Sequence, residues 1–244
     1  MTPIKLFCSD LDGTLLGNPE ATRRFSETWS GLSVSERPLL CYNSGRLVDN
    51  ILQLIEDEPL PQPDFVVGGV GSQLYDGTRN RAIAEFDKEL RVGWDLAKVE
   101  QILSGFPGVT RQPPECLNPY KSSWYLYDAP DVANAIRRHL ADAGLDVTII
   151  YSSNCDLDVL PARAGKGGAL RWLCRRIGIS LNDVLVAGDS GNDTDMFLLP
   201  EVRGIVVRNA HAELHEFVAR ARTNFATRLF ADGVLEGMAH FDLI

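Results

Sequence analysis

The chain has 244 residues, 45% of them hydrophobic, and its 33 acidic against 24 Lys+Arg side chains give a formal charge of −9. This length allows one large domain or a core domain with a smaller one, and either can bury a sizeable core, which excludes disorder as the main state. Because no Lys/Arg-rich block offsets the acidic excess, we expect neither nucleic acid nor a membrane surface as a partner. No stretch approaches the ~18 apolar residues of a membrane span and the N-terminus lacks a signal-peptide layout, so we expect a cytoplasmic protein.

Both ends of the chain show a repeating β–α order. Short, continuously apolar segments that end in Gly, Asp, Asn or Ser predict strands buried on both faces, at residues 4–9, 38–42, 65–70, 183–187 and 204–207. Helical patterns between them predict the crossover connections that parallel strands require, at residues 21–29, 47–56, 166–177, 193–199 and 212–221. We therefore predict an α/β fold with a doubly wound parallel sheet.

The middle of the chain interrupts this order. It contains strand-like segments next to helical ones, at residues 81–86 (strand), 96–106 (helix), 122–127 (strand), 132–143 (helix), 146–152 (strand) and 156–160 (strand). Strands paired beside helices in this way are typical of a compact α+β lobe. The expected organisation is a core formed by residues 1–75 and 158–244, with an inserted α+β lobe at residues 76–157.

Polar sequences follow three of the predicted core strands, at the sheet edge where functional residues gather in parallel sheets. They are DLDGT at residues 10–14, NSGR at 43–46 and GDSGND at 188–193, and Lys166 opens the helix before the third of these strands. Taken alone, each is also typical of a structural role, since Asp, Ser, Gly and Thr favour turns and helix caps. All of them together, in this order, indicate a functional site.

The residue types in this set are those of phosphoryl transfer. Asp10 and Asp12 at one strand end repel each other unless a cation lies beside them, and a hard divalent ion with oxygen ligands, Mg²⁺, is the natural one, with Asp189 as a third ligand. The Ser44 hydroxyl and the amides near Gly45 could hold phosphate oxygens. The Lys166 ammonium would then neutralise negative charge that develops on the transferred group.

This combination resembles the haloacid dehalogenase superfamily of aspartate-nucleophile phosphatases, whose D-x-D-G-T, S-G-R, K-G and G-D-S-G-N-D motifs occur here in the same order. The resemblance implies that Asp10 attacks phosphorus and forms an aspartyl-phosphate, and that Asp12 protonates the leaving oxygen and later activates water. It further implies Lys166 as the third catalytic residue. The implied Mg²⁺ ligands are Asp10, a backbone carbonyl of Asp12 and Asp189, with Asp193 in support. The expected substrate-binding residues of the core are Ser44, Gly45, Arg46 and Asn192, and the resemblance also places Asn192 in support of the metal site.

The inserted lobe looks like the cap of the subfamily that includes sucrose-phosphatases and mannosylfructose-phosphate phosphatases. The similar segments include NPYK (118–121), YSS (151–153), DLDVLP (156–161), VVRNA (206–210) and AHFD (239–242). By this resemblance the cap recognises the sugar, and the candidate hydroxyl contacts are Asn118, Lys121, Ser153 and Asp156. Departures from the sucrose-phosphatase pattern, at Gly13, Leu15 and Gln73 among others, leave the choice of disaccharide open.

The function predicted is hydrolysis of the phosphomonoester of a fructose-containing disaccharide phosphate, either sucrose 6-phosphate or mannosylfructose 6-phosphate. A broader sugar-phosphate phosphatase or a phosphosugar mutase remains an alternative, and an inert phosphatase-like binding module is disfavoured because Asp10, Asp12, Lys166 and Asp189 are all present. The expected partners are the sugar phosphate and, as a candidate, the synthase that makes it. We expect a monomer.

Overall fold

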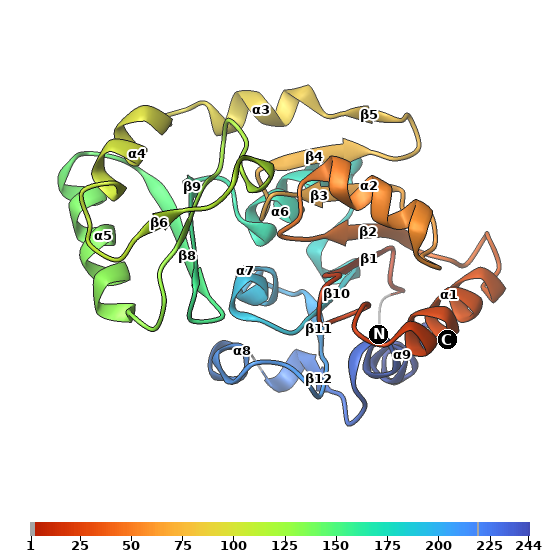
Figure 1. Cartoon of the computed structure of the whole chain (residues 1–244). Coiled ribbons are helices and arrows are strands. Elements are labelled where there is room, and N and C mark those ends of the chain that lie inside the picture. The colour runs from red at the N-terminus through yellow and green to blue at the C-terminus, as the bar shows by residue number, and fades with distance from the viewer. Residues whose placement is uncertain (1–2, 219) are drawn as a thin grey trace.

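The computed structural model describes residues 3–218 and 220–244, and its larger part is built on one twisted sheet (Figure 1). Within these residues the sheet has eight strands in the order β12-β11-β10-β1-β2-β3-β4-β5, parallel from β12 to β3 and antiparallel from β3 to β5. The strands are β1 Leu6–Ser9, β2 Leu39–Asn43, β3 Phe65–Gly68, β4 Gln73–Asp76, β5 Arg81–Ala82, β10 Val184–Gly188, β11 Arg203–Val206 and β12 Thr223–Phe225.

Helices cover both faces of this sheet, because alternate strand residues point to opposite sides. On one face Phe7, Leu40 and Val66 pack against α1 Pro19–Gly31, α2 Val48–Asp57 and α9 Phe230–His240. On the other face Leu6, Cys41 and Val67 pack against α3 Ala84–Leu90, α6 Lys166–Ile177 and α7 Thr194–Phe197. The doubly wound α/β core predicted from the sequence is confirmed.

A smaller antiparallel sheet stands beside the core, at the left of Figure 1. Its strand order is β6-β7-β9-β8, with β6 Thr110–Arg111, β7 Ser122–Tyr125, β8 Val147–Ser152 and β9 Asp156–Pro161. Helices α4 Leu96–Leu103 and α5 Pro130–Asp142 pack on one face through a cluster that includes Trp124, Ile136 and Leu157. We call this α+β unit the cap. The predicted domain boundaries stay a prediction: β5 still pairs with the core sheet, and β9 belongs wholly to the cap sheet.

Some predicted elements differ from the structure. Residues 81–86 form only the two-residue strand β5 before α3 begins, because Phe86 and Leu90 lie four apart on a helix and both pack into the core. The predicted helix at 212–221 corresponds to α8 Ala212–Phe217, and its residue 219 lies outside the described residues, as do residues 1–2 of the predicted core. The remaining short turns are η1 Pro114–Cys116, η2 Leu181–Asp183, η3 Gly191–Asp193 and η4 Arg220–Arg222.

The predicted elements do not include β4, β6, β12, α3 or α9. Helix α9 carries Gly233 and Gly237, which lower intrinsic helix propensity. Here the two glycines allow close packing: a Cβ on Gly237 would lie 2.5 Å from Ile205 of β11, and one on Gly233 would lie 2.4 Å from the Arg228 carbonyl oxygen. Within the described part of the chain, no helix is both long and apolar enough to cross a membrane.

Candidate active site

The carboxyl ends of β1, β2 and β10 meet beneath a cleft of about 570 Å³ between the core and the cap. Predicted site residues from all three strand ends line it together with predicted cap residues: Asp10, Asp12, Ser44, Gly45, Arg46, Lys121, Ser153, Asp156, Asp189 and Asn192. Segments far apart in the sequence therefore contribute to one cavity, as the motif order predicts.

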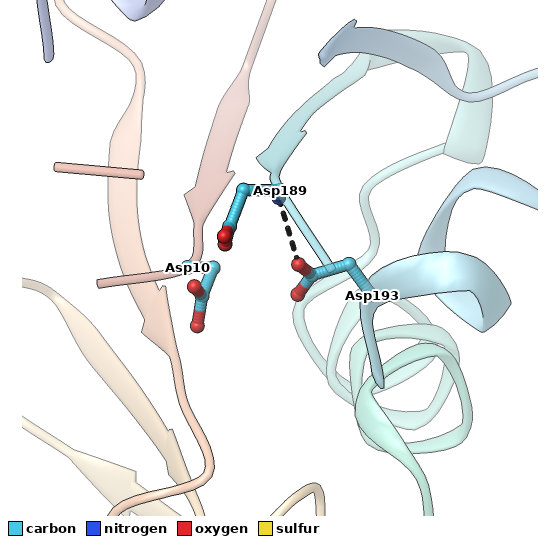
Figure 2. A group of neighbouring side chains, drawn as sticks. All are labelled: Asp10, Asp189 and Asp193. Carbon is cyan, nitrogen blue, oxygen red and sulfur yellow. Dashed lines mark hydrogen bonds between the residues drawn. The ribbon is translucent and has the colours of Figure 1, made fainter. Parts of the chain in front are cut away.

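Three buried carboxylates form the floor of the site. Asp10 follows β1, while Asp189 and Asp193 follow β10, and each offers an oxygen within 4.8 Å of the others. Figure 2 shows the Asp189 carboxylate next to the Asp10 side chain, with Asp193 to the right of both. The Thr14 hydroxyl donates to Asp189 Oδ1 at 3.1 Å, and this residue was not among the predicted site residues.

Lys166 is the cation of this cluster. Its side chain is fully buried, and Nζ donates to Asp10 Oδ1 at 2.7 Å and to Asp193 Oδ1 at 2.5 Å. Asp193 Oδ2 accepts from the backbone amides of Asp189 and Ser190, at 3.0 Å each. Both oxygens of Asp193 thus have partners, and of the three carboxylates it is those of Asp10 and Asp189 whose residues line the cleft.

The carboxylates exceed the cation in charge, and the pKa values reflect this. Burial raises the pKa of Asp10, Lys166 lowers it, and Asp193 and Asp189 raise it further. Burial and then the charge of Asp193 raise the pKa of Asp189 to about 6. Burial lowers the pKa of Lys166, but Asp10 and Asp193 outweigh this effect and keep the lysine charged. A site with hard oxygen donors and surplus negative charge fits a divalent ion such as Mg²⁺.

Gly13 is required by the close approach of the first motif to Asp189. Its φ is +82°, and a Cβ at this position would lie 2.3 Å from Asp189 Oδ2. The backbone next to Asp12 can therefore reach the carboxylate cluster only because residue 13 has no side chain.

At the mouth of the cleft, Asp12 and Arg46 form a bidentate ion pair. Arg46 donates from Nε to Asp12 Oδ2 and from Nη2 to Oδ1, both at 2.7 Å, and the side chains of Arg46 and Asp12 are 41% and 51% exposed. Ser44 is buried beside them and its hydroxyl accepts from the Arg46 amide at 3.2 Å. The second motif thus lines the same cleft as the acidic floor, and its phosphate-binding role stays a prediction.

The cap lines the cleft with polar groups from its sheet. Lys121 Nζ lies 3.3 Å from Asp158 Oδ1, which also accepts from the Ser123 hydroxyl at 2.6 Å. Asp156 Oδ1 accepts from Gln112 Nε2 at 2.9 Å. Asp156 and Asp158 are two residues apart on β9 and therefore share a face of the sheet.

One predicted sugar contact lies outside the cleft lining, and several residues that line the cleft were not predicted. Asn118 is absent from the described residues that line the cleft, because its side-chain amide donates to Ser72 Oγ at 2.8 Å and its oxygen accepts from the Tyr120 amide. Its role as a sugar contact stays a prediction. Residues that line the cleft but were not predicted include Asn50, Gln112, Glu115, Asp158 and His211. Only Asp158 had a sequence signal, namely the two-residue spacing from Asp156.

The model of the family described as sucrose-6F-phosphate phosphohydrolase matches residues 3–242. Mannosylfructose-phosphate phosphatase of Agrobacterium fabrum is 43% identical, over 100% of this chain and 99% of that protein. Sucrose-phosphatase 1 of Nicotiana tabacum is 34% identical over 98% of this chain, which spans only 59% of that longer protein.

Solved structures give the same result. The sucrose-phosphatase of Synechocystis sp., crystallised with sucrose and phosphate, is 31% identical, and the alignment covers 99% of each chain with a TM-score of 0.91. A sugar phosphatase of subclass IIB of the haloacid dehalogenase superfamily, 15% identical, shares the fold with a TM-score of 0.68 over 98% of this chain and 100% of that one. The match along nearly the whole length, in sequence and in fold, shows that the chain belongs to the sucrose-6F-phosphate phosphohydrolase family.

Proposed function

We propose that the chain is a magnesium-dependent phosphatase that hydrolyses the phosphomonoester of a fructose-containing disaccharide phosphate. The observation that carries this proposal is the buried pairing of Asp10 with Lys166, under a cleft whose other wall is polar cap surface. A phosphorylated disaccharide needs both parts, since phosphate requires cationic groups and sugar hydroxyls require hydrogen-bond donors and acceptors.

Asp10 is the nucleophile in this proposal. Lys166 binds Oδ1 at 2.7 Å, which fixes the carboxylate, and Oδ2, whose contact with the Thr14 hydroxyl is long at 3.5 Å, attacks phosphorus. As the Asp10–phosphorus bond forms, the bond from phosphorus to the sugar oxygen breaks and that oxygen takes a proton from Asp12. In the second step Asp12 accepts a proton from water, whose oxygen attacks phosphorus and releases inorganic phosphate and the free Asp10 carboxylate.

The divalent ion would be held by Asp10, Asp189 and the backbone carbonyl of Asp12. When bound, it neutralises the carboxylates and the negative charge of the phosphoryl oxygens. The Ser44 hydroxyl, the Gly45 region and Arg46 bind the remaining phosphate oxygens. Because Arg46 holds both oxygens of Asp12, an incoming phosphate competes for the guanidinium and frees Asp12 for proton transfer.

The cap supplies groups suited to sugar hydroxyls. Lys121 and Gln112 are donors, Asp156 and Asp158 are acceptors, and all four line the cleft. A cavity of about 570 Å³ lies within the usual range for sites that enclose a small ligand. The 43% identity to a mannosylfructose-phosphate phosphatase along the full chain favours that disaccharide phosphate over sucrose 6-phosphate.

The test is phosphate release from a panel of sucrose 6-phosphate, mannosylfructose phosphate, simple hexose phosphates and phosphoglycerate-linked sugars, with Mg²⁺ and after chelation. We expect kcat/KM for a disaccharide phosphate to exceed that for hexose phosphates by at least about tenfold. Activity should be lost on chelation and restored by Mg²⁺. Equal rates on the whole panel would refute the disaccharide assignment, and a bisphosphate product with little free phosphate would indicate a mutase instead.

A further inference from the structure

The position of Lys166 depends on how the N-terminus of α6 is held. Lys166 is the first residue of the helix, and the residue before it, Gly165, has no side chain with which to cap the free amides. A helix start without such a cap tends to fray, since its first amides lack intrahelical partners. The Lys166 ammonium nevertheless lies between two carboxylates at 2.7 and 2.5 Å.

A carboxylate from another helix takes the place of the missing cap. Asp195, the second residue of α7, accepts from the Gly167 amide with Oδ2 at 2.8 Å. A negative charge at this place also opposes the positive end of the helix dipole. Asp195 therefore satisfies the α6 amide that follows Lys166 directly.

The glycines around Lys166 make room for this contact. A Cβ on Gly165 would lie 2.5 Å from Asp195 Oδ2, and Gly165 has a φ of +97° that disfavours other residues. A Cβ on Gly167 would lie 2.3 Å from the Asp195 carbonyl oxygen. Lys166 is thus flanked by two glycines, both of which Asp195 approaches more closely than a side chain would allow.

The remaining contacts fix the other side of the same peptide. Asn43 donates from Nδ2 to the Lys166 carbonyl oxygen at 3.0 Å, so both polar groups of the Lys166–Gly167 peptide are bonded to other elements. Asp195 Oδ1 is buried and has no hydrogen-bond partner in the described part of the chain. A buried acceptor without a partner costs free energy. The hydrogen bond from the Gly167 amide to Asp195 Oδ2 is the interaction that offsets this cost.

We propose that Asp195 is a positioning residue that caps α6 from α7 and thereby holds the Lys166 ammonium against Asp10. The proposal deepens the proposed function, on which it rests through the use of Lys166 in phosphoryl transfer. A displacement of about 1 Å at a reacting group can cost on the order of 10²-fold in rate, so loss of this cap should affect turnover more than binding.

The test compares Asp195→Ala, which removes the acceptor, with Asp195→Asn, which keeps an oxygen for the Gly167 amide. The matched control is Asp76→Ala, which removes a buried aspartate of β4 that accepts from the Thr78 hydroxyl and the Arg79 amide, outside the cleft lining. Three quantities are measured on each full-length protein: the melting temperature, the steady-state constants for p-nitrophenyl phosphate, and the ¹⁵N resonance of the Lys166 ammonium.

We expect Asp195→Ala to lower kcat by about 10–100-fold with KM within about twofold, and to shift the Lys166 resonance. Asp195→Asn should restore most of kcat and the resonance, and Asp76→Ala should change only the melting temperature.

An Asp195→Ala protein with wild-type kcat, or with a kcat loss that Asp76→Ala reproduces, would overturn the proposal. If the wild type hydrolyses no phosphate ester, the proposed function fails, and an unchanged Lys166 resonance in Asp195→Ala then overturns the positioning role by itself.

Discussion

The two walls of the cleft are built in different ways. On the core side Asp10, Lys166 and Asp193 are at most 4% exposed, and each ionised group has at least one charged partner. On the cap side Ser153 is exposed and Asp156 is half-buried with a hydrogen bond from the neutral Gln112, and Lys121 and Asp158 form the one buried ion pair among the described lining residues of the cap. The core wall is suited to one fixed reaction, whereas the cap wall offers polar groups that can be exchanged without disturbing the reacting carboxylate.

This difference follows from the cost of burying charge. A buried, surplus carboxylate destabilises the fold unless it is protonated, paired or bound to a cation. Such an arrangement indicates chemistry rather than stability. Neutral hydrogen-bonding groups at a half-open surface cost much less to change. Substitutions in the core should therefore act on kcat and on metal binding, and substitutions in the cap should act on which sugar phosphate is preferred.

The largest effect is expected at the nucleophile. Asp10→Asn keeps the shape of the side chain but replaces the attacking carboxylate with an amide, so phosphate release should fall by at least about 10³-fold. The fold should persist, because the oxygen of the substituted amide could still accept from Lys166. Phosphate release and thermal melting are the measurements, and turnover close to that of the wild type would contradict the mechanism.

The next effect concerns stability without metal. Since the pKa of Asp189 is raised to about 6 in the folded protein, ionising it there costs free energy that the unfolded chain does not incur. The protonated Asp189 carboxyl contributes to the free energy of unfolding at low pH. This contribution is lost as the pH rises from about 4 through about 6. Asp189→Asn should therefore stabilise the chelated protein by about 3 kcal/mol above pH 7, and by little at pH 4.

Denaturant unfolding of the wild type and of Asp189→Asn, both in the presence of a chelator, measures this difference as a function of pH. A difference that stays constant between pH 4 and 7.5 would contradict the electrostatic account of the floor. Added Mg²⁺ should narrow the difference at pH 7.5 by stabilising the wild type, because the variant has lost one ligand.

The smallest effect is expected in the cap. Lys121→Met removes a donor at the cleft and should raise KM for the preferred disaccharide phosphate by about tenfold, with p-nitrophenyl phosphate hydrolysed as before. Because Asp158 would lose its ion-pair partner, Lys121→Met combined with Asp158→Asn is the matched control for stability. Equal losses of activity on the disaccharide phosphate and on p-nitrophenyl phosphate would contradict the proposal that the cap wall selects the sugar while the core wall carries the reaction.

The core and its half of the site could be predicted from the sequence because each motif is short and follows an apolar strand. Asp10, Ser44 and Asp189 needed only their position after a strand to be placed at one edge of a parallel sheet. The family membership and the fold predicted by resemblance are confirmed by the matches along the chain. The roles of the individual site residues stay predictions.

The cap half was less predictable because its polar groups meet only through antiparallel pairing. Gln112 precedes a short turn and carries no motif, yet it reaches Asp156 on another strand of the sheet. Asn118 lies in a segment similar to the family but bonds Ser72 of the core instead of facing the cleft. Asp195 was likewise inconspicuous, since it contacts Gly167, a residue of another helix 28 positions earlier in the sequence.

The central claim, that Asp10 forms a covalent phosphoryl intermediate, is tested most directly by trapping that intermediate. Protein mixed with substrate and Mg²⁺ is quenched in acid within a turnover, reduced with borohydride and analysed by peptide mass spectrometry. The account predicts conversion of Asp10 to homoserine, because reduction cleaves an aspartyl-phosphate but not a free carboxylate, and no conversion at Asp12 or Asp189. Phosphate release without any modification at Asp10 would contradict it.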